Sequence, residues 1–169
     1  MNHHFQVIDI FQKHFMATPF CGIEIGTAEG LLTKSLLLYF PNLTHIYGVD
    51  PYVSNYERGF EMARPQEWHD DRYSQAKVAL AVYEGRYTLI KDFSDNAVSL
   101  TPDIVDFVWI DGDHNSDQVI KDIKNYYPKV RKGGIFGGHD YPLALRYIKD
   151  LTQEIVMVGD DLTWWLVKE

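Results

Sequence analysis

The sequence predicts an α/β fold of the Rossmann-like, doubly wound kind: a mostly parallel sheet with helices on both faces and a C-terminal antiparallel hairpin at one edge. Two observations predict it. Short apolar, β-rich runs alternate with stretches of helical periodicity along most of the chain, which is the pattern of a parallel sheet. Near the end, two β-rich runs at residues 155–158 and 163–167 flank a short Gly/Asp turn, which is typical of a hairpin.

The individual elements follow from periodicity. We expect strands at residues 22–25, 44–49, 87–90, 104–110 and 134–136, and helices at 28–39, about 69–84 and about 115–127. A helix-like pattern precedes the first strand, with apolar residues at 5, 8, 11 and 15. Residues 51–68 show no clear period and carry aromatic side chains, so we expect a loop, either a substrate lid or a surface loop without a role.

Composition narrows the class of protein. The chain has 169 residues, 46% of them hydrophobic, which fits a single domain, 1–169, with a substantial core. Its net charge of −8 argues against partners such as nucleic acid or an anionic membrane. The single Cys21 excludes an intrachain disulfide framework. With no long apolar run and no signal-peptide pattern, a cytoplasmic location is the default expectation.

The chain is organised around a glycine-rich turn. The apolar run at 22–25 leads into EIGTAEG at residues 24–30, and a helical pattern follows until Pro41. Gly26 permits backbone angles closed to other residues, and Gly30 permits close approach of a ligand. A helix N-terminus at this place offers free N–H groups to a ligand. The spacing differs from the dinucleotide fingerprint GxGxxG, which disfavours an NAD-dependent dehydrogenase.

An acidic residue follows each predicted parallel strand. These residues are Glu24, Asp50, Asp92, Asp111 and Asp140. The carboxyl ends of parallel strands share one edge of the sheet, which is where α/β proteins bind ligands. So many carboxylates would repel one another, and at least one would stay protonated unless cations arrive. Helix capping or turn formation explains any one of these acids but explains all five poorly.

These motifs resemble class I S-adenosylmethionine-dependent methyltransferases from about residue 22 to 168. The resemblance implies that Glu24, Gly26, Thr27 and Gly30 belong to the cofactor-binding turn. GVDPY at residues 48–52 is similar to the second-strand motif, in which the acid, here Asp50, binds the ribose hydroxyls. KDFS at 91–94 is similar to the adenine-contacting turn, so Asp92 would accept from the adenine amino group, with Phe93 or a neighbour against the base.

A narrower resemblance points to metal-dependent small-molecule O-methyltransferases, related to catechol O-methyltransferases and to enzymes of antibiotic biosynthesis. It rests on VWIDGDH at 108–114 and GGIFGGHDY at 133–141. The resemblance implies a divalent metal, such as Mg²⁺ or Mn²⁺, bound by Asp111, His139 and Asp140, with Asp111 and His114 as catalytic residues and His114 as the general base. His139 departs from the Asp or Glu of better-known members. Gly137 and Gly138 suggest that the strand has ended before the metal pair, which frees the backbone to turn.

The expected activity is methyl transfer from S-adenosylmethionine to an oxygen of a small-molecule acceptor. A metal-independent methyltransferase and a non-catalytic S-adenosylmethionine-binding protein are the alternatives. Acceptor recognition is expected from residues 51–68, from the loop after Asp140, or from another subunit of a homo-oligomer.

Overall fold

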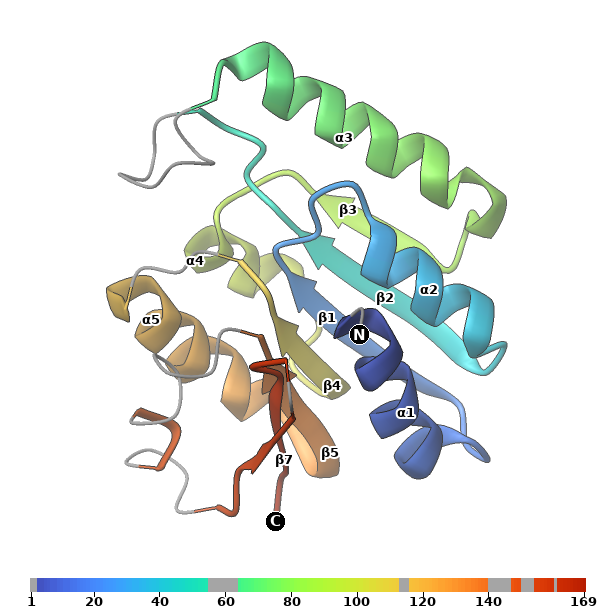
Figure 1. The fold of residues 1–169 in the computed structure, drawn as a ribbon, viewed down its shortest axis with the longest axis vertical. Coiled ribbons are helices and arrows are strands. Elements are labelled where there is room, and N and C mark those ends of the chain that lie inside the picture. The colour runs from blue at the N-terminus through green and yellow to red at the C-terminus, as the bar shows by residue number, and fades with distance from the viewer. Residues whose placement is uncertain (1–2, 55–63, 113–115, 140–146, 150–153, 160) are drawn as a thin grey trace.

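One seven-stranded sheet forms the centre of the molecule, in the order β3-β2-β1-β4-β5-β7-β6 (Figure 1). The computed structural model describes residues 3–54, 64–112, 116–139, 147–149, 154–159 and 161–169. The strands are β1 (Phe20–Ile25), β2 (Leu43–Val49), β3 (Tyr87–Ile90), β4 (Val105–Ile110), β5 (Val130–Gly138), β6 (Met157–Val158) and β7 (Trp164–Val167). Strands β1 to β5 pair in parallel, whereas β7 is antiparallel to both β5 and β6. The predicted fold class, including the C-terminal antiparallel hairpin, is confirmed.

Helices cover both faces of the sheet (Figure 1). They are α1 (His3–Phe15), α2 (Leu31–Tyr39), α3 (Gln66–Leu80), α4 (Ser94–Ala97) and α5 (Ser116–Tyr126), with 3-10 turns at Ala81–Tyr83, Val98–Leu100 and Tyr127–Lys129. One core cluster joins α1, α2 and the end of α3 to the sheet, and the other joins α4 and α5 to the opposite face. This two-sided burial explains why the central strands are almost continuously apolar. In the described part of the chain, no helix is both long and apolar enough to span a membrane.

The helix α3 begins three residues earlier than periodicity predicts, at Gln66 rather than at residue 69. Its first turn makes polar contacts: the Gln66 side chain bonds the backbone of Tyr52 and Ser54. Polar contacts of this kind leave no apolar period in the sequence. The predicted loop at 51–68 is therefore shorter, and its middle, residues 55–63, lies outside the described part of the chain.

The strand β5 corrects a second prediction. We expected it to end before Gly137, but it runs to Gly138 and pairs these glycines with β4 on one side and β7 on the other. A Cβ atom on Gly137 would lie 2.6 Å from the Trp109 ring and 2.8 Å from the Trp164 carbonyl oxygen. The glycines therefore let a central strand pass two tryptophan residues. The strand is longer than expected, but it ends at Gly138, before His139, as the sequence led us to expect.

Candidate functional site

The glycine-rich turn is wedged between the ends of β2 and β4. Gly26 has φ +90°, its N–H donates to the Val49 carbonyl (2.8 Å), and a Cβ atom there would lie 2.1 Å from the Asp111 carbonyl oxygen. Gly30 has φ +75° and precedes the first residue of α2 without a side chain that could cap it. The first-turn N–H groups of α2 are therefore left for a ligand or water to satisfy. Both glycines adopt the positive φ that the turn requires, and their role in ligand binding stays a prediction.

Asp50 connects the end of β2 to this turn. Its Oδ2 accepts the N–H of Ala28 (2.9 Å), and its Oδ1 accepts the N–H of Tyr52 (2.9 Å). Burial raises the pKa of Asp50 above its ordinary value, although these two N–H donors and the charge of Arg72 oppose the shift. Each carboxylate oxygen is held in place by one backbone donor and retains lone-pair capacity for a ligand hydroxyl.

Glu24 is a buried acid near the end of β1, beneath the glycine-rich turn. Its side chain is buried, and the Thr33 hydroxyl of α2 donates to its Oε2. Burial is the main cause that raises the pKa of Glu24 to about 8, and the charges of Asp111 and Asp50 raise it further against the Thr33 hydrogen bond. The raised pKa of Glu24 has the direction expected if one strand-end acid stays protonated, but its main cause is burial, and repulsion from the other acids adds to it. Thr27, in the same turn, is also buried, and its Oγ1 has no hydrogen-bond partner in the described structure.

Asp92 and Phe93 lie in the turn between β3 and α4. Oδ1 of Asp92 accepts the Phe93 N–H (2.7 Å) and the Asn96 side-chain amide (2.8 Å). The Phe93 side chain is 40% exposed. An exposed ring beside a fixed carboxylate suits the flat face of a base, while the two hydrogen bonds also give Asp92 the turn-forming role considered above.

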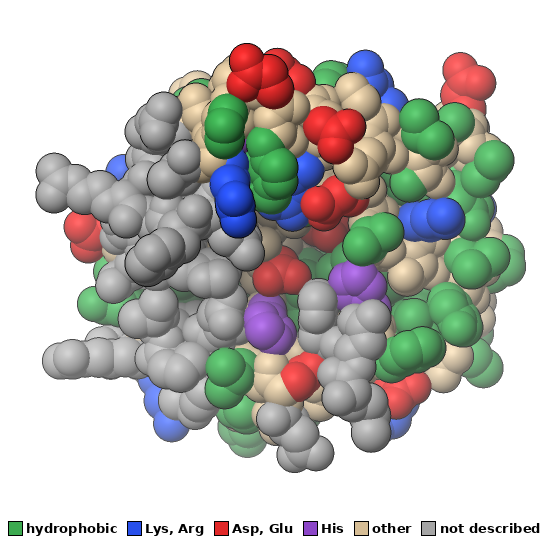
Figure 2. Space-filling model, turned by 45° about the horizontal axis from the view of Figure 1, so that its top comes forward, with side chains coloured by type: hydrophobic (Ala, Val, Ile, Leu, Met, Phe, Trp, Pro, Cys, Tyr) green, Lys and Arg blue, Asp and Glu red, His purple; other side chains and the backbone are tan. Residues whose placement is uncertain are grey.

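Asp111 and His139 leave neighbouring strands side by side. The preceding residues, Ile110 of β4 and Gly138 of β5, are paired, and the His139 N–H donates to the Ile110 carbonyl (3.0 Å). The other predicted metal and base residues, Asp140 and His114, lie outside the described residues. Within the described ranges, no group of three His, Cys, Asp or Glu side chains is close enough to hold a metal. In Figure 2, acidic and histidine side chains lie together around a hollow, beside residues that are not described.

Sequence patterns missed two residues that support the turn. The phenol of Tyr52 donates to the Ala28 carbonyl (2.7 Å). From α3, Arg72 makes a two-pronged ion pair with Glu29, with nitrogen–oxygen distances of 2.8 and 3.0 Å. Tyr52 and Arg72 are both distant in sequence from the residues that they contact, so no local spacing of residues predicts these contacts. The nearest signal is their position, since Tyr52 follows the strand-end acid by two residues and Glu29 lies inside the glycine-rich motif.

The strand order, the glycine-rich turn after β1, the acid after β2 and the antiparallel β7 are together typical of the class I S-adenosylmethionine-dependent methyltransferase fold. A model of the methyltransferase domain family matches residues 23–141, and the chain belongs to that family.

Two kinds of relative accompany this match. The uncharacterized protein R132 of Acanthamoeba polyphaga mimivirus is 27% identical over 143 residues, covering 82% of this chain; the chain spans 59% of that relative's length. Among solved structures, the O-methyltransferase NovP has a TM-score of 0.69 at 15% identity, covering 98% of this chain and 78% of NovP. A putative rRNA-methylase from Clostridium thermocellum has a TM-score of 0.71 at 15% identity, covering 98% and 94%. At these identities the solved structures share the fold alone.

Proposed function

We propose that this methyltransferase transfers the methyl group of S-adenosylmethionine to an oxygen of a small-molecule acceptor, with help from a divalent metal. The observation that carries the donor half is the link between the glycine-rich turn and Asp50. The turn and the acid are joined by the Ala28 N–H bond (2.9 Å), at the edge where the strands end. The Asp50 carboxylate, which can accept hydrogen bonds from hydroxyl groups, thus lies beside the uncapped N–H groups of α2. This pair suits a ligand that carries both ribose hydroxyls and an amino-acid carboxylate.

The proposed donor site divides its tasks among a few residues. Asp50 would accept the ribose hydroxyls, and Asp92 with Phe93 would meet the adenine. The glycine-rich turn would bring its backbone close to the amino-acid part of S-adenosylmethionine, through Gly26, Thr27 and Gly30. Glu24, in the strand that leads into this turn, completes the proposed site. When bound, S-adenosylmethionine supplies an electrophilic methyl group carried on a sulfonium.

For the acceptor half, the proposed ligands of the metal are Asp111, His139 and Asp140. The first two fit a shared site because they follow paired residues of β4 and β5. A divalent ion there would bind the acceptor oxygen and lower its pKa. As the O–CH₃ bond forms and the S–CH₃ bond breaks, the hydroxyl proton must leave, and His114 is the proposed base. A carboxylate and imidazole set favours Mn²⁺ or a similar ion over Mg²⁺ alone.

The choice of a small-molecule acceptor rests on charge. The chain carries 16 Lys and Arg against 24 Asp and Glu residues. A surface of this balance would repel the phosphates that an RNA methylase must hold. We therefore propose a small molecule and no nucleic-acid partner, although the solved structures that share this fold include an O-methyltransferase and a putative rRNA-methylase.

Calorimetry with S-adenosylhomocysteine tests the donor site. Asp50→Ala removes charge-assisted hydrogen bonds worth roughly 1.5–3 kcal/mol each, so affinity should fall about tenfold or more. Asp71→Ala, which removes an exposed acid of α3, is the matched control and should bind like the wild type. Wild-type affinity in a folded Asp50→Ala variant would refute the ribose assignment.

Metal titration tests the acceptor site separately. We expect one Mn²⁺ to bind the wild-type protein, as followed by electron paramagnetic resonance, and binding to be lost in Asp111→Asn and His139→Ala. Chelation should abolish methyl transfer, and added Mn²⁺ or Mg²⁺ should restore it. If neither ion binds and chelation leaves activity intact, the metal half of the proposal fails while the donor half stands.

A further inference from the structure

Tyr52 and Ala28 are joined in a way that the cofactor site does not by itself require. Asp50 accepts the Ala28 N–H, and the Tyr52 phenol donates to the carbonyl oxygen of the same residue (2.7 Å). The Tyr52 N–H in turn donates to Asp50. The three residues form a closed set of hydrogen bonds, called here the Asp50–Tyr52–Ala28 clamp, which holds Ala28 at both its N–H and its carbonyl.

The clamp coincides with backbone strain. Within the described residues, three non-glycine residues have positive φ, and two of them are Ala28 (φ +49°) and Tyr52 (φ +48°). A left-handed conformation costs a residue with a Cβ atom about 1–2 kcal/mol. Such strain persists only where surrounding contacts over-determine it, and it gathers at functional sites. Here the strained residues are bonded to each other and to the acid proposed to bind ribose.

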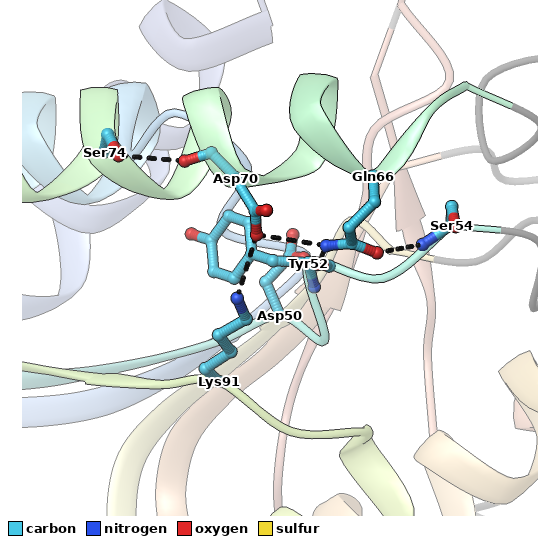
Figure 3. Close-up of polar contacts among 7 residues, drawn as sticks. All are labelled: Asp50, Tyr52, Ser54, Gln66, Asp70, Ser74 and Lys91. Carbon is cyan, nitrogen blue, oxygen red and sulfur yellow. Dashed lines mark hydrogen bonds and ion pairs between the residues drawn. The ribbon is translucent and has the colours of Figure 1, made fainter.

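Tyr52 is itself fixed from the side of α3 (Figure 3). Tyr52 is 2% exposed, and the centroid of its ring lies 4.9 Å from the centroid of the Tyr73 ring. The side-chain amide of Gln66 donates to the Tyr52 carbonyl (2.9 Å) and accepts the Ser54 N–H (3.1 Å). Gln66 also donates to Asp70 (3.0 Å), which pairs with Lys91 of the segment after β3 (3.2 Å). Tyr52 and Ser54 are therefore tied to the first turn of α3 through one glutamine side chain.

We propose that Tyr52 is a positioning residue for the cofactor: through its phenol it holds the glycine-rich turn in the binding conformation and keeps the Asp50 carboxylate aimed at the ligand. The proposal rests on the proposed cofactor site. Tyr52 acts through Ala28 and Asp50 and needs no contact with the cofactor. Without the phenol, Ala28 loses the bond that offsets its strain, and the turn must be reordered each time the cofactor binds.

The variant Tyr52→Phe keeps the buried ring and removes only the hydroxyl. We expect the dissociation constant for S-adenosylhomocysteine and the KM for S-adenosylmethionine to rise about tenfold, while kcat at saturating cofactor stays within about twofold. The matched control is Tyr73→Phe, which removes a hydroxyl from the adjacent ring and should leave both constants unchanged. Adding Ala28→Gly to Tyr52→Phe should restore part of the affinity, since glycine adopts positive φ without strain.

Three results would overturn the proposal. If Tyr52→Phe lowers thermal stability but binds the cofactor like the wild type, while Asp50→Ala does not, the tyrosine is structural and the cofactor site stands. If the wild-type protein binds neither cofactor nor product, the proposed function fails and the positioning role with it. Should Tyr52→Phe not fold, the hydroxyl proton of Tyr52 in the ligand-free wild type decides: nuclear magnetic resonance must show it exchanging slowly, and exchange at the rate of a free phenol would show that the bond to Ala28 does not exist.

Discussion

Replacing Glu24 by glutamine should stabilise the ligand-free protein by about 3 kcal/mol at pH 7.5. In the folded protein the pKa of Glu24 is raised to about 8, against 4.5 for an ordinary glutamate. Between these values the folded state binds more protons than the unfolded state, so the free energy of unfolding falls by about 1.4 kcal/mol per pH unit as pH rises. From pH 5 to 7.5 this amounts to about 3 kcal/mol. Glutamine cannot ionise, so the variant should not lose this free energy of unfolding as pH rises.

Urea denaturation at pH 5 and at pH 7.5 measures the effect. The wild type should lose stability between the two pH values, and Glu24→Gln should lose much less. Glu67→Gln, an exposed acid in the first turn of α3, is the matched control and should keep the wild-type slope. If the free energy of unfolding changes equally with pH in the wild type and in Glu24→Gln, the assignment of a proton to Glu24 is refuted. The variant differs from the wild type only in lacking this ionisable group.

Two further predictions follow from the same structure. Binding of the cationic S-adenosylmethionine should release up to about one proton near pH 7.5, because the cation favours the ionised form of Glu24. Calorimetry detects the released proton as a binding heat that varies with the ionisation enthalpy of the buffer. Identical heats in all buffers, or proton release that persists in Glu24→Gln, would contradict the prediction. Gly137→Ala should lower the free energy of unfolding by about 2 kcal/mol or more, because its Cβ atom would lie 2.6 Å from Trp109, whereas Gly112→Ala, at 3.5 Å from its nearest neighbour, should cost little; equal urea midpoints would refute this.

The sequence by itself determined the fold class and the position of the glycine-rich turn. Alternation of apolar runs with helical periods reports burial, and burial on both faces is what distinguishes a parallel sheet. The sequence could predict the glycines at 26 and 30 and the acid at 50, because each belongs to a local signal of a few residues at a fixed spacing after a strand. The same rule placed Asp111 and His139 at one edge, since parallel strand ends coincide.

Only the tertiary structure decided how that turn is supported. The Tyr52 phenol reaches Ala28 across 24 positions of the chain, and Arg72 reaches Glu29 across 43. Such pairings depend on how α3 lies over the sheet, which no local pattern encodes. The length of β5 was missed for a related reason: the two glycines at its end look like a strand breaker in sequence, and the two tryptophan residues beside Gly137 come from β4 and β7. Local chemistry placed the site, and long-range packing fixed its shape.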